Sequence, residues 1–222
     1  LRHVLQEKGV QEGDRVVGYI PCIPEATVSF LAANSLGAVW SSCSPDFGTA
    51  AVLDRFAQIE PTVLITVDSY LYGGKTFDKT ETVQALIAAL PSLRAVIVIT
   101  DKKTYQDETR LMITWREVVH QDGHSMEFVR VPFSHPIWIL YSSGTTGLPK
   151  AIVHSHGGIL LEQLKYGTFH NDYKPGERCF WYTTTGWMMW NYIHGSLLAG
   201  ATMVLYDGSP GYPDLRVLWQ FI

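Results

Sequence analysis

The chain has 222 residues, of which 46% are hydrophobic and 17% are charged, and its formal net charge at pH 7 is -4. This composition supplies enough apolar side chains for a sizeable core and excludes a disordered chain. The net charge provides no basic surface for nucleic acid or an anionic membrane, and no apolar run approaches the roughly 20 residues of a membrane span. We therefore expect a soluble, folded protein.

Three cysteines, Cys22, Cys43 and Cys179, are spread along the chain and form no Cys-x-x-Cys pair. Their odd number and wide spacing argue against a disulfide framework and against a zinc ribbon. We expect each to be a free, buried thiol, which is compatible with the reducing cytoplasm.

In the first half of the chain, short β-rich runs alternate with helical patterns. The predicted strands cover residues 15–20, 38–40, 62–67 and 95–100, and the predicted helices cover 24–36, 47–58 and 80–90. Strands that alternate with helices of about a dozen residues indicate a parallel sheet with helices on its faces. The segment 101–134 is more polar and irregular, with one short helix expected at 115–120, so a subdomain boundary is expected there.

The second half repeats the alternation, with strands at 137–141, 152–153, 178–183 and 201–205 and helices at 158–169 and 188–199. The sequence thus predicts an α/β fold of two subdomains with largely parallel sheets, 1-134 and 135-222. Residues 1–5 read as the last turns of a helix, and the helical pattern at 215–222 stops without a cap. We expect the chain to be part of a longer protein.

A loop rich in glycines and hydroxyl side chains lies between two predicted strands and ends in a lysine. It consists of Tyr141, Ser142, Ser143, Gly144, Thr145, Thr146, Gly147, Leu148, Pro149 and Lys150. Glycines allow tight turns that expose backbone N–H groups, and hydroxyls and an ammonium group bind anionic oxygens. A Walker A motif is excluded, because it has four residues between its glycines and a Ser or Thr after the lysine. A polar hairpin connection is the alternative, but the density of hydroxyls and the terminal lysine favour a polyphosphate-binding loop.

This loop resembles the phosphate-binding loop of the acyl-adenylate-forming superfamily, which includes acyl-CoA synthetases, luciferases and adenylation domains. Most members have glycine after the lysine, where this chain has Ala151. The resemblance implies that ATP phosphates are bound by Ser142, Ser143, Gly144, Thr145, Thr146, Gly147 and Lys150. It also implies two half-reactions: a carboxylate attacks the α-phosphate of Mg²⁺-ATP and releases pyrophosphate, and the thiol of CoA then displaces AMP. The family's catalytic lysine is expected in a C-terminal domain that is absent from these residues.

Residues 44–48, Ser-Pro-Asp-Phe-Gly, resemble the short-chain branch of the synthetases, which act on acetate, propionate and acetoacetate. In that branch the residues after a Gly-Trp pair line the acyl pocket. By similarity, the resemblance implies that Trp187, Met188 and Met189 line this pocket here. Methionines can shape a small irregular cavity and tryptophan can limit it, although ordinary core packing is the alternative. Within the branch the resemblance favours acetoacetate, with acetate and propionate as alternatives.

A 3-oxo acid such as acetoacetate needs a partner for its keto oxygen. The nearest candidate donors in the sequence are the hydroxyls of 183–185 and the indole N–H groups of Trp187 and Trp190. For CoA, the segment 72–76 resembles a loop that meets the CoA phosphates in acetyl-CoA synthetases. Only Lys75 keeps a positive charge there, and a solvated surface turn is the alternative.

Two histidines, His154 and His156, lie two apart on a predicted strand with no third ligand in view. We expect a structural role for them and no metal site. Three classes of function remain open: a short-chain acyl-CoA synthetase that activates acetoacetate, another adenylate-forming ligase, or a truncated nucleotide-binding module without catalysis. The sequence gives no indication of the oligomeric state, and we expect these 222 residues alone to make no acyl-CoA.

Overall fold

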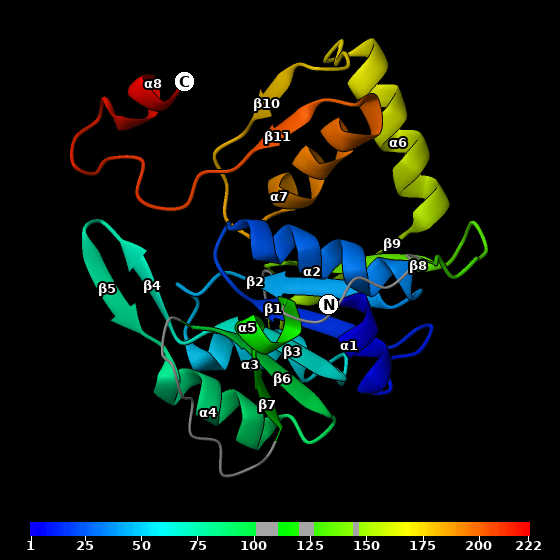
Figure 1. The fold of residues 1–222 in the computed structure, drawn as a ribbon, viewed down its shortest axis with the longest axis vertical. Helices are drawn as coiled ribbons and strands as arrows, with labels where there is room; N and C mark the ends of the chain where they lie inside the picture. Colours follow the sequence, from blue (N-terminus) through cyan, green and yellow to red (C-terminus); the bar gives the residue numbers. More distant parts are fainter. Residues whose placement is uncertain (101–110, 120–126, 144–146) are drawn as a thin grey trace.

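The structure is a computed structural model and describes residues 1–100, 111–119, 127–143 and 147–222. Its main feature is a sheet covered by helices, which confirms the predicted α/β class (Figure 1). Within the described ranges seven strands form this sheet, in the spatial order β7-β6-β3-β1-β2-β8-β9. Their bounds are β1 (Arg15–Tyr19), β2 (Val39–Cys43), β3 (Val63–Val67), β6 (Ala95–Ile99), β7 (Met112–Thr114), β8 (Pro136–Ser142) and β9 (Lys150–Ser155).

Neighbouring strands of this sheet run parallel except β8 and β9, which pair antiparallel. Alternate side chains of a strand face opposite sides of a sheet, so Val16 and Val17 of β1 enter two different cores. One core is shared with the first two helices and the other with the next two. These helices are α1 (Arg2–Glu7), α2 (Pro24–Ser35), α3 (Thr49–Phe56) and α4 (Thr80–Ala89).

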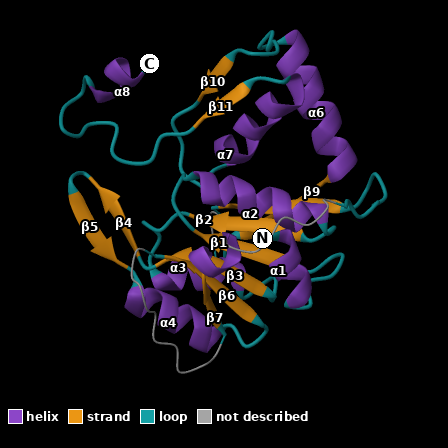
Figure 2. Cartoon of the chain, in the orientation of Figure 1, coloured by secondary structure: helices purple, strands orange, loops and turns teal. Residues whose placement is uncertain are grey.

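The remaining elements lie around this central layer (Figure 2). They are the antiparallel hairpin of β4 (Ser69–Tyr72) and β5 (Lys75–Asp78), α5 (Trp115–Val119), α6 (His156–Phe169), β10 (Arg178–Phe180), α7 (Met188–Ile193), the 3₁₀ helix η1 (His194–Ala199), β11 (Thr202–Val204) and α8 (Val217–Phe221). β10 and β11 form a parallel pair, and η1 packs against α6. All three cysteines are free and buried, as predicted.

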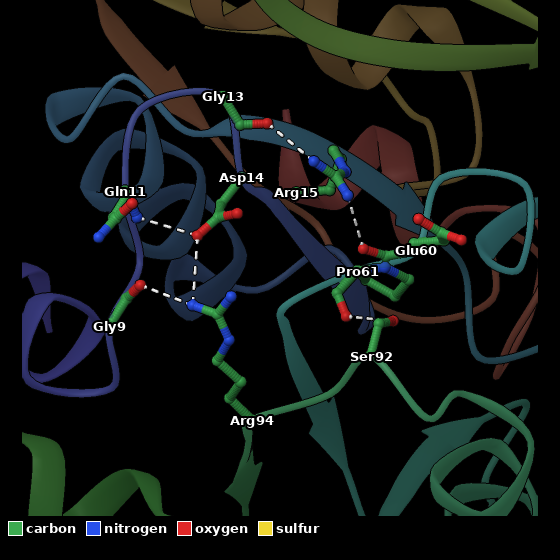
Figure 3. A network of polar contacts seen from close by, with 9 residues as sticks. All are labelled: Gly9, Gln11, Gly13, Asp14, Arg15, Glu60, Pro61, Ser92 and Arg94. Atoms are coloured by element: carbon green, nitrogen blue, oxygen red, sulfur yellow. Dashed lines mark hydrogen bonds and ion pairs between the residues drawn. The ribbon is translucent and has the colours of Figure 1, made fainter.

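A network of polar contacts links the turns at the edge of the sheet where the parallel strands begin (Figure 3). The guanidinium of Arg15, the first residue of β1, donates to the carbonyl of Gly13 at 3.1 Å and to that of Glu60 at 2.9 Å. Arg94, directly before β6, lies 3.8 Å from the carboxylate of Asp14. Side chains thus satisfy main-chain groups of the turns at this edge.

Most predicted elements are confirmed within one or two residues. Among the exceptions, β2 continues to Cys43 and β7 was not predicted, and three further details differ. The strand expected at 178–183 ends at Phe180. Beyond it the chain turns toward the edge of the main sheet, where the hydroxyl of Thr185 donates to the carbonyl of Ile20. The helix expected at 188–199 is α-helical only as far as Ile193 and continues as η1, where the hydroxyl of Ser196 bonds to a carbonyl three residues earlier. The hairpin of β4 and β5 was not predicted, although two successive glycines with positive φ at its tip are typical of a tight hairpin turn.

The strands on both sides of residue 134 belong to one sheet, because Trp40 of β2 pairs with Trp138 of β8. The division of the chain into 1-134 and 135-222 remains a proposal. Membership of this sheet favours a later division point, after Ser155 at the end of β9.

Candidate active site

The predicted phosphate loop leaves the sheet at the carboxyl end of β8, where open α/β sheets place their ligands. Ser142 ends β8 and pairs with Lys150, the first residue of β9, so the two ends of the loop are held side by side. Gly147 has a φ of 103°, a conformation that favours glycine. Ser142, Ser143, Gly147 and Lys150 are all exposed, so their polar groups are open to a ligand. Gly144, Thr145 and Thr146 lie outside the described residues.

Helix α3 and the turn that follows it support both ends of this loop. The phenol of Tyr141 donates to the carbonyl of Arg55 at 2.7 Å, and the side-chain amide of Gln58 donates to the carbonyl of Pro149 at 3.0 Å. The guanidinium of Arg55 lies 5.0 Å from the ring centre of Phe47 and 5.9 Å from that of Tyr141. Burial raises the pKa of Tyr141, so its phenol stays protonated and keeps this bond. The strand end and the loop exit are therefore fixed relative to one helix.

A second segment is tied to the same edge of the sheet. The hydroxyl of Ser42, in β2, donates to the carbonyl of Thr185 at 2.8 Å, and the hydroxyl of Thr185 donates to the carbonyl of Ile20 at 2.6 Å. At the next residue, Gly186, an added Cβ would lie 3.1 Å from the ring of Phe47. The chain thus passes closely over the ends of β1 and β2 before it enters α7. This brings the residues after Gly186 to the sheet edge that also carries the phosphate loop.

Two of the three predicted acyl-pocket residues, Met188 and Met189, line one cavity of about 390 Å³. This cavity, named the acyl cavity after the role predicted for its two methionines, lies between α6 and α7. Its other lining residues are Ile159, Glu162, Gln163, Tyr166, Asn171, Trp181 and Tyr192. Trp187 is not among them and is 65% exposed, because it precedes the first turn of α7 in an extended conformation.

The donors expected from the sequence for a keto oxygen are absent from the lining of the acyl cavity. Trp190 is fully buried and stacks on Trp40, with ring centres 6.2 Å apart. The hydroxyl of Thr185 is already engaged with Ile20, as described above. The structure instead presents Gln163, a buried side chain of α6 that the sequence analysis did not single out. No local signal marks it, because it resembles any glutamine within a helix.

A smaller cavity of about 210 Å³ opens where β1 and β2 end, near the base of the β4–β5 hairpin. Tyrosines contribute much of its wall, among them Tyr70 and Tyr72 of β4, together with Asp207. Burial raises the pKa of Asp207 above its usual range. Lys75, the residue predicted to contact CoA, pairs with Tyr72 across the hairpin and is exposed, but does not itself line this cavity.

The two histidines after the loop have separate surroundings. His154 accepts a hydrogen bond on its Nδ1 from the indole of Trp138 at 2.8 Å, whereas His156 lies near His135, with ring centres 5.7 Å apart. Burial, followed by the neighbouring His135, lowers the pKa of His156. Within the described ranges, no group of three or more His, Cys, Asp and Glu side chains is arranged to hold a metal ion.

Comparison with known proteins relates this arrangement to an enzyme family. The family model described as AMP-binding enzyme matches residues 1–222. The chain belongs to the AMP-binding enzyme family. It is 44% identical to acetoacetyl-CoA synthetase of Danio rerio over 98% of the chain and 34% of that protein. It is also 41% identical to malonamoyl-CoA synthetase of Penicillium aethiopicum, over 91% of the chain and 29% of that protein.

A solved structure of acetoacetyl-CoA synthetase from Streptomyces lividans matches this AMP-binding chain with a TM-score of 0.94 and 53% sequence identity. The match covers 99% of the chain and 34% of that protein, so the chain spans about a third of the relatives it matches. As for membranes, none of the helices in the described parts of the chain combines the length and apolar character needed for a span.

Proposed function

We propose that the full-length protein containing this chain is an ATP-dependent acid–CoA ligase that activates acetoacetate through an acyl-adenylate. The observation that supports this most directly is the 53% identity, over 99% of the chain, to an acetoacetyl-CoA synthetase of known structure. The position of the phosphate loop at the carboxyl end of β8, close to a segment that leads into a cavity, agrees with this chemistry.

In this proposal the hydroxyls and glycines of the loop, Ser142, Ser143, Gly144, Thr145, Thr146 and Gly147, orient the triphosphate of Mg²⁺-ATP. The ammonium group of Lys150 offsets charge that develops on pyrophosphate as it departs. Mg²⁺ would enter with ATP as part of the substrate. The catalytic lysine expected for the family would come from outside these residues.

The acid would bind in the acyl cavity, with Met188 and Met189 against its carbon chain and Trp187 near the entrance. A second candidate acid is malonamate, because one relative is named malonamoyl-CoA synthetase. Acetoacetate and malonamate differ only in the group on the third carbon, a methyl or an amino group, and both carry a carbonyl oxygen there. Acetate and propionate lack that oxygen and are weaker alternatives.

CoA would approach past the β4–β5 hairpin, where Lys75 offers a positive charge to its phosphates and the smaller cavity lies close to Tyr72. The three free cysteines agree with a place in the reducing cytosol.

The test is acid-dependent exchange of pyrophosphate into ATP, followed by thioester formation with CoA, using the full-length protein. A panel of acetoacetate, malonamate, butyrate, propionate and acetate should give the highest kcat/KM for acetoacetate. If acetate or propionate is preferred at least tenfold, the proposed substrate is wrong. If no acid supports exchange, the ligase function itself is wrong.

A further inference from the structure

Gln163 occupies a special position in the acyl cavity. It is the only polar lining residue in the described part of the chain that is buried, with 6% of its surface exposed. The mouth of the cavity is formed by exposed side chains such as Glu162, Tyr166 and Trp181. Within the described residues no hydrogen bond engages the side-chain amide of Gln163, and its atoms keep contact with open space, so the amide can meet a ligand in the cavity.

The same side chain separates the acyl cavity from a second one of about 400 Å³. Of the residues that the structure describes, Ile159 and Gln163 alone line both cavities, so they form the partition between them. The wall of the second cavity is mostly apolar and includes Phe30, Leu31, Ile137, Trp138, Leu197 and Leu198. The amide of Gln163 lies against Gly195 of η1, where an added Cβ would overlap it. The absence of a side chain at Gly195 therefore makes room for the amide in the partition.

We propose that Gln163 determines acid choice in two ways, a proposal that rests on the function proposed above. Its amide N–H donates to the carbonyl oxygen on the third carbon of the acid, at the closed end of the acyl cavity. Its side chain also keeps longer acyl chains out of the second cavity. A site built to hydrogen-bond a polar substrate group strongly disfavours the analogue without it, because the buried partner is then left unpaired.

The first test replaces Gln163 with methionine, which keeps the length of the side chain and removes the amide. In the full-length protein, kcat/KM is measured for acetoacetate and for butyrate, which has the same four carbons without the keto oxygen. The ratio of the two values should fall about 10- to 100-fold in Gln163→Met. Leu164→Met is the matched control, because Leu164 is exposed on the same helix and lines neither cavity. Its ratio should equal that of the unmodified protein.

The second test is Gln163→Ala, which removes most of the partition. The ratio of kcat/KM for hexanoate over butyrate should rise at least tenfold, because each additional methylene in an apolar pocket is worth about 10-fold or more. Leu164→Ala should leave that ratio unchanged. Both measurements compare two acids on one preparation, so partial loss of folded protein does not alter the ratios.

The outcomes separate the two proposals. An unmodified protein that does not prefer acetoacetate over acetate and butyrate contradicts the proposed function. An unmodified protein that prefers acetoacetate, with an unchanged ratio in either Gln163 variant, leaves the function standing and overturns the role of Gln163.

Discussion

Replacing Lys150 with alanine is expected to slow adenylate formation strongly without disturbing the fold. Lys150 begins β9 with an exposed side chain, and it makes no ion pair with any other described residue. Nothing in the described structure therefore depends on its ammonium group. Substitutions at such surface positions change the free energy of unfolding by no more than about 0.5 kcal/mol.

The expected kinetic cost comes from the transition state. A charge-assisted contact with the departing pyrophosphate is worth about 1.5–3 kcal/mol, which corresponds to roughly a 10- to 150-fold loss of rate. Pyrophosphate leaves only in the first half-reaction. The second half-reaction, measured from isolated acyl-adenylate and CoA, should therefore change by less than about threefold.

The assay uses the full-length protein and compares single-turnover rates for the two half-reactions. Lys174→Ala is the matched control, because Lys174 is also exposed and is paired only with Asp172 in the described structure. Equal slowing of both half-reactions in Lys150→Ala, or a drop in unfolding free energy of more than about 1 kcal/mol, would refute this reasoning.

Three further predictions concern the cavity, the sheet edge and pH. Met189→Trp should lower the ratio of kcat/KM for acetoacetate over acetate at least about tenfold, because it reduces the room for the longer acid; an unchanged ratio would remove Met189 from the pocket. Arg15→Met should lower the free energy of unfolding by about 1–3 kcal/mol, since Arg15 donates to three main-chain carbonyls. The free energy of unfolding is measured by chemical denaturation, with Arg116→Met, at an exposed position, as the control. Equal losses of unfolding free energy in the two variants would contradict the prediction. Burial lowers the pKa of His194 to about 4, below its unfolded value of 6.5. His194 therefore favours the folded state above pH 6.5, and up to about 3 kcal/mol of stability should be lost as the pH falls from 6.5 to 4. His194→Gln should flatten this part of the curve of unfolding free energy against pH. An equally steep curve in the variant would show that His194 does not cause the loss of stability.

The sequence alone was sufficient for most of the local elements of the fold, although not for β4, β5 and β7. The strands predicted at 62–67 and 95–100 are confirmed within one residue as β3 and β6, because strands buried on both faces consist almost entirely of apolar residues. The predicted phosphate loop could be proposed from the sequence, since its glycines, hydroxyls and lysine are contiguous in the chain. Its location between β8 and β9 followed from the apolar runs on either side.

Which elements become neighbours was decided by the tertiary structure. Trp138 of β8 pairs with Trp40 of β2 across nearly a hundred residues, and no periodicity within either strand encodes that pairing. The proposed division at residue 134 falls between two strands of this one sheet. Non-local pairing depends on the complementary surfaces of whole elements, which a local pattern does not contain.

The lining of the acyl cavity shows the same limit at the level of single side chains. Trp187, Met188 and Met189 are consecutive, yet only the two methionines line the cavity, because the chain changes direction where α7 begins. Gln163 reaches the partition only because Gly195, more than thirty residues later, lacks a side chain at the point of contact. Sequence identifies residue types that suit a ligand, whereas burial and the packing of distant segments decide which of them face it.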